Sequence, residues 1–139
     1  MPKTLSDVMS SNPVTVPATA TVLQAAQRMR DEDIGDVIVL DGDRVAGILT
    51  DRDVVVRAVA EGRDPEGCSV RDVCSGELVT LSPGDDVQRA IDLMQQKAVR
   101  RIPVMEDGRP VGIVSIGDLA IASDGEDALA AISAARPNS

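Results

Sequence analysis

The sequence predicts an α+β fold of the α/β type, in which one β-α-β-β-α unit is used twice. Three observations lead to this prediction: an internal repeat, a composition suited to an aliphatic core, and helix and strand patterns that recur in the same order. Residues 5–55 align with 70–120 without a gap, and a match of that length indicates a duplication. Neither copy is large enough to bury its own sheet, so we expect the two to pack face to face as one module with a pseudo-twofold axis.

The composition limits both the core and the chemistry. The chain has 139 residues, 43% of them hydrophobic, with no Phe, Tyr, Trp or His. The core must therefore be built from Val, Ile, Leu, Met and Ala. The same absences remove aromatic platforms for stacking bases, imidazole catalysis and the commonest metal ligand.

Charge and targeting signals narrow the partners and the compartment. The net charge is −9, which repels nucleic acid phosphates, so nucleic acid binding is not expected. The first residues lack the apolar core of a signal peptide, and no run of about 18 apolar residues predicts a membrane span. Cys68 and Cys74 form no disulfide framework, and we expect ordinary thiols in a cytoplasmic protein.

Each copy begins with a short strand and an amphipathic helix. The strands are expected at 13–16 and 78–81. The helices are predicted by apolar residues at i, i+3, i+4 and i+7, namely Val22, Ala25, Ala26 and Met29 in copy one and Val87, Ala90, Ile91 and Met94 in copy two. Thr21 with Gln24 has the form of a capping box, and Asp85 or Asp86 would cap the second helix.

A hairpin and a second helix complete each copy. Paired apolar runs stand at 37–40 and 45–49, and again at 102–105 and 111–114, separated by the turn signals Asp41-Gly42 and Asp107-Gly108. The second helices are expected to run through 54–60 and 119–122. This places repeat one at 5–60, a linker at 61–69, repeat two at 70–122, and a tail at 123–139 with a short apolar-striped helix at 126–135.

One seven-residue phrase occurs in both copies, and two interpretations of it stay open. Residues 47–53 read GILTDRD and residues 112–118 read GIVSIGD. Thr50 with Asp53, and Ser115 with Asp118, have the spacing of a capping box, the commoner role of such a phrase. In the other interpretation, a helix N-terminus and a hydroxyl bind a phosphate while the Asp accepts hydrogen bonds from a ribose.

The second interpretation requires a positive charge near the phrase. Asp51 and Asp53 oppose an anion at the first turn of the copy-one helix. Arg52 is one candidate to compensate, and Arg100 and Arg101, just before the second hairpin, are the others. Arg100 and Arg101 are each equally consistent with an ordinary solvated strand edge.

The ordered set of motifs resembles a tandem pair of CBS domains, often called a Bateman module. The matching segments are DVMSSNPVTV, GILTDRD, VRRIPVMEDGRPVGIVS and the downstream GDLA. The resemblance covers about residues 5–122. It implies a regulatory binding module that is not an enzyme, and that binds AMP, ATP or S-adenosylmethionine in clefts between the two repeats.

The resemblance also implies roles for particular residues. Asp53 and Asp118 would hold the ribose, and Thr50 and Ser115 would contact phosphate or the ribose edge. The base would lie between the first two strands of a repeat, near Thr15 and Val37 in copy one and near Thr80, Ile102 and Pro103 in copy two. Aliphatic side chains would sandwich it, because the chain has no aromatic ring.

The two copies differ, and the function has an alternative. Copy two has a proline in its strand with arginines before it, whereas copy one has Asp36 at that place; the sequence does not decide which cleft is occupied. We expect a homodimer that signals to a separate, unidentified regulated protein. The alternative is a structural or dimerisation module with vestigial nucleotide sites. Catalysis ranks last, since no nucleophile–base pair or metal cluster is evident.

Overall fold

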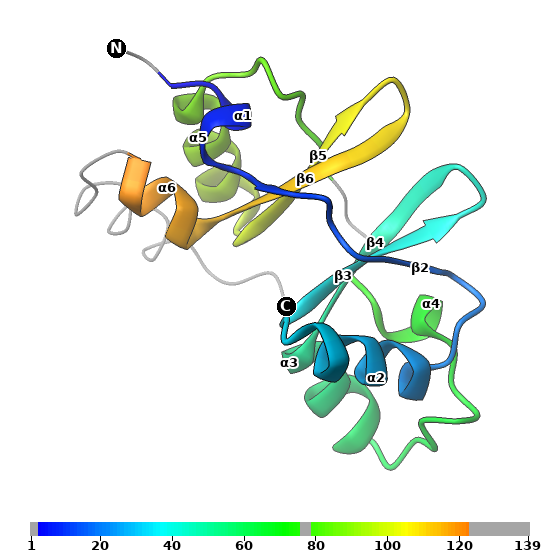
Figure 1. Cartoon of the computed structure of the whole chain (residues 1–139). Coiled ribbons are helices and arrows are strands. Elements are labelled where there is room, and N and C mark those ends of the chain that lie inside the picture. Colours follow the sequence, from blue (N-terminus) through cyan, green and yellow to red (C-terminus); the bar gives the residue numbers. More distant parts are fainter. Residues whose placement is uncertain (1–2, 76–78, 123–139) are drawn as a thin grey trace. The chain divides into compact units, whose positions relative to one another are not determined.

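The computed structural model describes residues 3–75 and 79–122 (Figure 1). These residues fall into two compact units. Val14–Leu78 form the first, called here the repeat-one unit. Met1–Pro13 together with Val79–Ser139 form the second, the repeat-two unit. Within the described residues no helix is long and apolar enough to cross a membrane.

The repeat-one unit is a three-stranded sheet covered by helices. In this sheet β3 is central, with β2 parallel to it on one side and β4 antiparallel on the other. The elements are β2 (Thr15–Pro17), α2 (Val22–Glu32), β3 (Asp36–Asp41), β4 (Arg44–Thr50), α3 (Asp51–Asp53), the π-helix η1 (Val54–Val59) and α4 (Val70–Val73).

The core of the repeat-one unit is aliphatic, as the composition requires. The buried face of α2 carries Val22, Ala25 and Met29, which belong to one cluster with Val37 and Leu49 of the sheet. A fully buried side chain of this size contributes about 2 kcal/mol. Because β3 is buried along three consecutive residues, its sequence is a continuous apolar run and does not alternate.

The repeat-two unit has the same plan. Its sheet has the order β1-β6-β5, with both pairings antiparallel. Its core is a second aliphatic cluster that includes Leu5, Met94, Ile102 and Leu119. The elements are α1 (Leu5–Val8), β1 (Ser10–Ser11), α5 (Val87–Lys97), β5 (Arg101–Glu106), β6 (Arg109–Ser115) and α6 (Ile116–Ala122).

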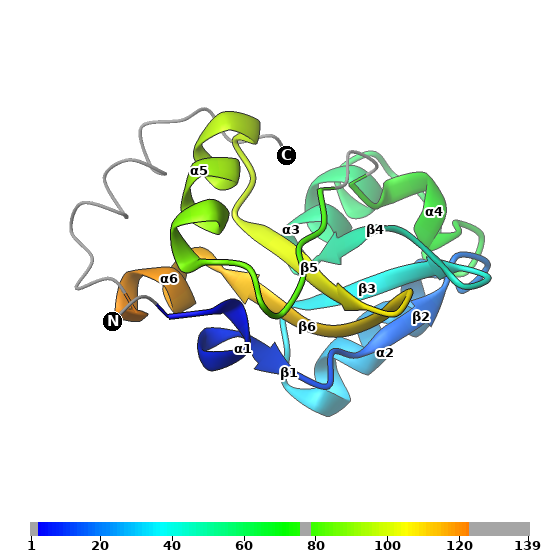
Figure 2. The same ribbon diagram turned by 90° about the horizontal axis from the view of Figure 1, so that it is seen from above.

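Each unit takes its short N-terminal segment from the other copy of the sequence. α1 and β1 begin the first copy but belong to the repeat-two unit, where β1 pairs with β6 (Figure 2). α4 begins the second copy but belongs to the repeat-one unit, where Ser75 bridges to Ile48 of β4. The compact units therefore have boundaries different from those of the sequence repeats.

The glycine of each repeated phrase makes room for the exchanged segment. A Cβ on Gly47 would overlap the carbonyl oxygen of Ser75 and lie 2.8 Å from the sulfur of Cys74. A Cβ on Gly112 would lie 2.9 Å from both Cγ of Met9 and the carbonyl oxygen of Ser10. Glycine is needed at both positions because another backbone approaches too closely for any side chain.

The hairpins are confirmed, but their turns are not equivalent. The predicted apolar runs lie within β3, β4, β5 and β6. In the second hairpin the loop is Asp107-Gly108, and both residues have positive φ, 53° and 76°. In the first hairpin Asp41 is still a strand residue paired with Arg44, so the loop is Gly42-Asp43. The Asp-Gly signal located this turn one residue early.

The first strand of copy two is weaker than predicted. Copy one has β2, but Val79 and Thr80 are in no strand, and Leu81 forms only an isolated parallel bridge to Val104. Leu78 and the predicted helix at 126–135 lie outside the described residues. Compared with β2, two residues of this segment are unpaired. The one remaining bridge has the same register as the pairing of β2 with β3.

The helix caps are confirmed in copy one and partly in copy two. Thr21 Oγ1 accepts from the Gln24 N–H at 3.1 Å, and Gln24 Oε1 accepts from the Thr21 N–H at 3.0 Å. Asp86 is the N-cap of α5, with no hydrogen bond from its side chain to the cap. The Asp85 carboxylate accepts from the Ser82 N–H at 2.8 Å and closes the preceding turn.

Candidate functional site

The repeated phrase ends a strand and begins a helix in each unit. Thr50 ends β4 and Ser115 ends β6. The Thr50 N–H donates to Asp53 Oδ2 at 2.9 Å and the Asp53 N–H donates to Thr50 Oγ1 at 3.1 Å. Ser115 and Asp118 form the same two bonds at 2.9 and 3.2 Å. The capping-box interpretation is therefore confirmed in both copies.

A capping box does not exclude a ligand, because it uses only part of each group. It occupies Oδ2 of the carboxylate, and an ionised carboxylate can accept about four hydrogen bonds. It also fixes the side chain in one rotamer. Each box therefore holds a carboxylate and a hydroxyl in a fixed geometry, with Oδ1 of the carboxylate left by the box for another partner.

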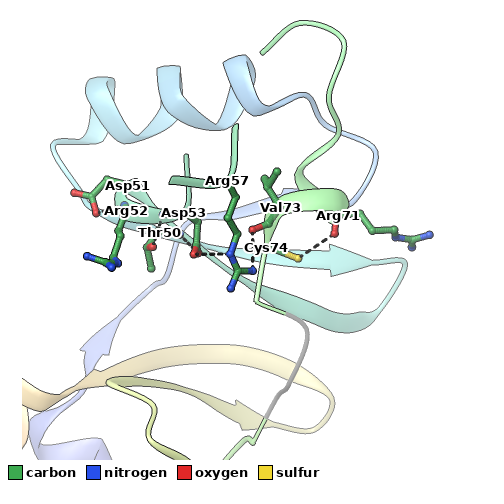
Figure 3. Close-up of polar contacts among 8 residues, drawn as sticks. All are labelled: Thr50, Asp51, Arg52, Asp53, Arg57, Arg71, Val73 and Cys74. Carbon is green, nitrogen blue, oxygen red and sulfur yellow. Dashed lines mark hydrogen bonds and ion pairs between the residues drawn. The ribbon is translucent and has the colours of Figure 1, made fainter. Parts of the chain in front are cut away.

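In the repeat-one unit that partner is Arg57. Its Nε lies 3.9 Å from Asp53 Oδ1, and its Nη1 donates to the carbonyl oxygen of Val73 at 3.5 Å (Figure 3). Within residues 3–75 and 79–122, Asp53 is the one buried polar or charged side chain, with 3% exposed. Arg57 supplies the counter-charge that burial of a carboxylate requires.

Cys74 completes this cluster. Burial, followed by the nearby Asp53 carboxylate, raises the pKa of the Cys74 thiol. The thiol donates to the carbonyl oxygen of Arg71 at 3.7 Å (Figure 3). A raised pKa keeps the sulfur protonated at neutral pH, and only the thiolate is a nucleophile. The arrangement therefore makes Cys74 a packing residue of the cluster.

The corresponding place in the repeat-two unit is different. Asp118 is partly exposed, and the residue four positions after it is Ala122, where copy one has Arg57. An arginine four residues after an aspartate on a helix is a recognisable ion-pair signal. Sequence reasoning overlooked Arg57, although the pair Asp53 and Arg57 had this spacing.

The cross-strand neighbours of the two box hydroxyls carry opposite charge. In the repeat-one unit Asp36 is the cross-strand partner of Thr50, and the exposed Asp51 follows Thr50 in the chain. In the repeat-two unit Arg101 is the cross-strand partner of Ser115. The carbonyl oxygen of the exposed Arg100 accepts from the N–H of Ile116, the first residue of α6.

Of the three predicted arginines, the structure thus brings Arg100 and Arg101 beside a box. Arg52 lies on the first turn after Thr50, is exposed, and its N–H donates to Asp51 Oδ1 at 2.8 Å. The guanidinium that pairs with Asp53 is that of Arg57. Among the described residues, the cation paired with the copy-one carboxylate is therefore one that the sequence analysis did not name.

The residues predicted to flank a base lie on the first two strands, with unequal exposure. Thr15 is half-buried and pairs with Ile38 across β2 and β3. Val37 and Ile102 are fully buried in their clusters. Thr80 is exposed and precedes Leu81, whose N–H donates to the carbonyl oxygen of the buried Pro103 at 3.1 Å. Any base at these places meets backbone and strand edges more than the side chains of Val37 or Ile102.

The fold and the repeated boxes define a class of protein, the tandem β-α-β-β-α modules with one hydroxyl–carboxylate pair per copy. The family model for the CBS domain matches residues 5–59 and again 70–125. The chain therefore belongs to the CBS-domain family.

Curated and solved relatives agree with this assignment. The CBS domain-containing protein YhcV of Bacillus subtilis is 37% identical over 84% of this chain and 83% of its own length. A crystal structure of Hypoxic Response Protein I with two coordinated zinc ions is 33% identical, with a TM-score of 0.75 over 86% of this chain and 98% of that one. The hexameric CBS-CP12 protein from bloom-forming cyanobacteria is 28% identical, with a TM-score of 0.80 over 89% and 74%.

The comparisons confirm the resemblance and the α+β tandem fold predicted from the sequence. CBS-domain tandem modules are generally regulatory and ligand-binding, and not enzymes. In the part of this chain that the structure describes, no group of three or more Cys, Asp or Glu residues is placed to hold a metal ion.

Proposed function

We propose that this protein is a sensor of an adenosine-containing ligand, AMP, ATP or S-adenosylmethionine, that signals to a separate regulated protein. The observation that carries the proposal is the hydroxyl–carboxylate pair held in the same geometry in both units, Thr50 with Asp53 and Ser115 with Asp118. Each carboxylate would accept from the ribose hydroxyls, and each hydroxyl would contact the phosphate or the ribose edge.

The chemistry of a ribose fits such a box. Two neighbouring hydroxyls donate well to one carboxylate, and bonds to an ionised acceptor are roughly twice as strong as neutral ones. The box fixes the carboxylate before the ligand arrives, which lowers the entropy lost on binding. We propose no catalytic step, since a binding module needs only a difference in affinity between two states of the protein to transmit a signal.

The local charge favours the repeat-two unit for a phosphorylated ligand. Arg100 and Arg101 lie beside Ser115, whereas Asp36 and Asp51 lie beside Thr50. A phosphate near Thr50 would meet two carboxylates within the first turn and the adjoining strand. We therefore expect AMP or ATP to occupy the repeat-two unit at lower concentration than the repeat-one unit.

The alternative function is a dimerisation module with vestigial sites, and one observation favours it. Asp53 is buried and already paired within its own unit, as expected for a residue kept for structure. We propose a cytoplasmic homodimer under either function. Its support is the exposed valines of η1, Val55, Val56 and Val59, together with the hexameric assembly of the cyanobacterial relative.

The first experiment uses the absence of Trp and Tyr. The purified protein absorbs almost nothing at 280 nm, so a co-purified adenine would appear as a clear band near 260 nm. Mass spectrometry of the released material would then identify it. Calorimetric titration of stripped protein with AMP, ATP and S-adenosylmethionine follows, using Asp118→Asn and Asp53→Asn to assign each unit. If all three ligands fail to bind while the dimer persists, the dimerisation module is the correct function.

A further inference from the structure

We propose that Arg57 is a specificity-determining residue of the repeat-one unit, which makes binding at Asp53 depend on an anionic group in the ligand. The inference rests on the proposed function, since it concerns the ligand of the same box. It states a selectivity: the repeat-one unit discriminates between AMP and adenosine through Arg57, whereas the repeat-two unit has Ala122 at the equivalent position.

The first step is the state of Asp53 before a ligand binds. Its Oδ2 accepts from the Thr50 N–H at 2.9 Å, and its Oδ1 faces Arg57 Nε at 3.9 Å. Only 3% of the side chain is exposed. A ribose that donates to Oδ1 must therefore reach a buried oxygen that faces the guanidinium, and the guanidinium must move aside.

The second step is the mobility of the guanidinium. The Arg57 side chain is 38% exposed, and its contacts within the cluster are long, 3.9 Å to Asp53 and 3.5 Å to the carbonyl oxygen of Val73 (Figure 3). Contacts of that length are weak, because a good charged hydrogen bond is about 2.7–2.9 Å. The side chain is thus held over Asp53 without being locked there.

The third step is the fate of the displaced charge. A neutral nucleoside that binds Asp53 Oδ1 displaces Arg57 and supplies no negative charge to pair with the guanidinium. A nucleoside monophosphate brings its own anion, and a guanidinium matches phosphate oxygens in a bidentate geometry. The other charges beside Thr50, Asp36 and Asp51, repel a phosphate. When a ligand displaces Arg57 from Asp53, the guanidinium therefore gains a new anionic partner only if the ligand carries a phosphate.

The repeat-two unit supplies an internal control. Four residues after Asp118 the chain has Ala122, so no guanidinium from that position competes for the carboxylate. Its phosphate preference would come from Arg100 and Arg101 without a displacement step. Adenosine should consequently bind the repeat-two unit more readily than the repeat-one unit.

The test measures the ratio of AMP to adenosine affinity by calorimetry on the 139-residue chain. In an Asp118→Asn background the site of the repeat-two unit is weakened, so the binding that remains is that of the repeat-one unit. In that background Arg57→Gln removes the charge but keeps a donor for the Val73 carbonyl, and Arg57→Lys keeps the charge. We expect Arg57→Gln to lower the AMP:adenosine ratio about tenfold, the scale of one charged hydrogen bond, and Arg57→Lys to retain most of the ratio.

A reciprocal variant keeps the test independent of the folding of Arg57→Gln. In an Asp53→Asn background, Ala122→Arg places an arginine four residues after Asp118, and we expect it to weaken adenosine several-fold while AMP changes little. An unchanged ratio in Arg57→Gln, or in Ala122→Arg, would show that the arginine is only structural and overturn the inference. A structural role would shift the melting temperature and weaken both ligands equally.

The outcomes also separate this inference from the proposed function. If the natural chain binds AMP but the Asp118→Asn background binds neither ligand, the repeat-one unit has no site: the inference fails and the sensor function stands. If the natural chain binds neither AMP nor adenosine, nor ATP or S-adenosylmethionine, the proposed function fails and the inference with it.

Discussion

The two units share a backbone plan and differ in the charges placed on it. Both keep the capping box, the glycine under the exchanged segment and the strand-to-helix junction. Around Thr50 the chain has Asp36, Asp51 and Arg57; around Ser115 the equivalent residues are Arg101, Ile116 and Ala122. Features required for folding are therefore present in both copies, whereas the charges that would contact a ligand differ between them.

The largest expected effect is a loss of stability when the glycine that both units share is replaced. Gly47→Ala should destabilise the protein by about 3 kcal/mol, since a Cβ there overlaps the carbonyl oxygen of Ser75. Gly112→Ala should cost less, because its nearest neighbour is the flexible side chain of Met9. Urea unfolding followed by far-ultraviolet circular dichroism measures both.

Gly84→Ala is the matched control for the two glycine variants, since a Cβ on Gly84 meets nothing within 4 Å. Equal, small losses in all three variants would show that the exchanged segments do not pack as tightly as the structure places them.

The next effect concerns how the units differ in charge. Asp118→Asn should weaken AMP binding by more than tenfold, since a charged acceptor for the ribose is lost.

Arg100→Gln should weaken AMP binding about threefold and leave adenosine binding unchanged, as expected for an exposed charge. Raising the salt concentration should reduce the Arg100 effect. Arg109→Gln, at the exposed far end of the hairpin, is the control, and an equal effect there would point to net charge alone.

A smaller effect on stability is expected at the C-terminal ends of α2 and α5. α2 and α5 both end at a residue with φ of 54°, Asp33 and Ala98. Alanine is strained in this left-handed conformation, whereas glycine is not. Ala98→Gly should therefore stabilise the repeat-two unit by about 1 kcal/mol.

Asp33→Gly should give only a few tenths of that gain, because aspartate tolerates the left-handed region better than alanine. Thermal unfolding of the two variants in parallel measures the difference, and a loss of stability in Ala98→Gly would contradict the assigned helix end.

The smallest effect concerns Cys74 beside Asp53. Burial and the carboxylate raise the pKa of this thiol in the folded state. The resulting contribution to stability is complete below the unfolded thiol pKa of about 8.5 and is lost as the pH rises toward the higher folded value. In a Cys68→Ala background, alkylation of Cys74 should be slower than that of a free thiol at pH 8.

Asp53→Asn removes the second cause of the raised pKa and should speed this alkylation modestly. Mass spectrometry of the alkylated protein over a pH series measures the apparent pKa in both forms. An apparent pKa below that of a free thiol would contradict the placement of Cys74 beside the carboxylate.

Much of the fold was predictable because its signals are local. The i, i+3, i+4, i+7 pattern located α2 and α5, and the apolar runs located β3 to β6. The spacing of Thr50 and Asp53 predicted a capping box that the structure contains. The weak strand at 79–81 was overestimated, because β propensity does not report whether a neighbour is available for pairing.

The sequence by itself determined the duplication, the family resemblance, the aliphatic core and the two capping boxes, since each depends on residues close together in the chain or on a fixed offset between copies. Only the tertiary structure decided that α1 and α4 exchange units, that Gly47 and Gly112 leave room for them, and that Arg57 reaches the Val73 carbonyl. These depend on contacts between distant segments, whose closure is set by packing of the whole unit and leaves no periodic trace in the sequence.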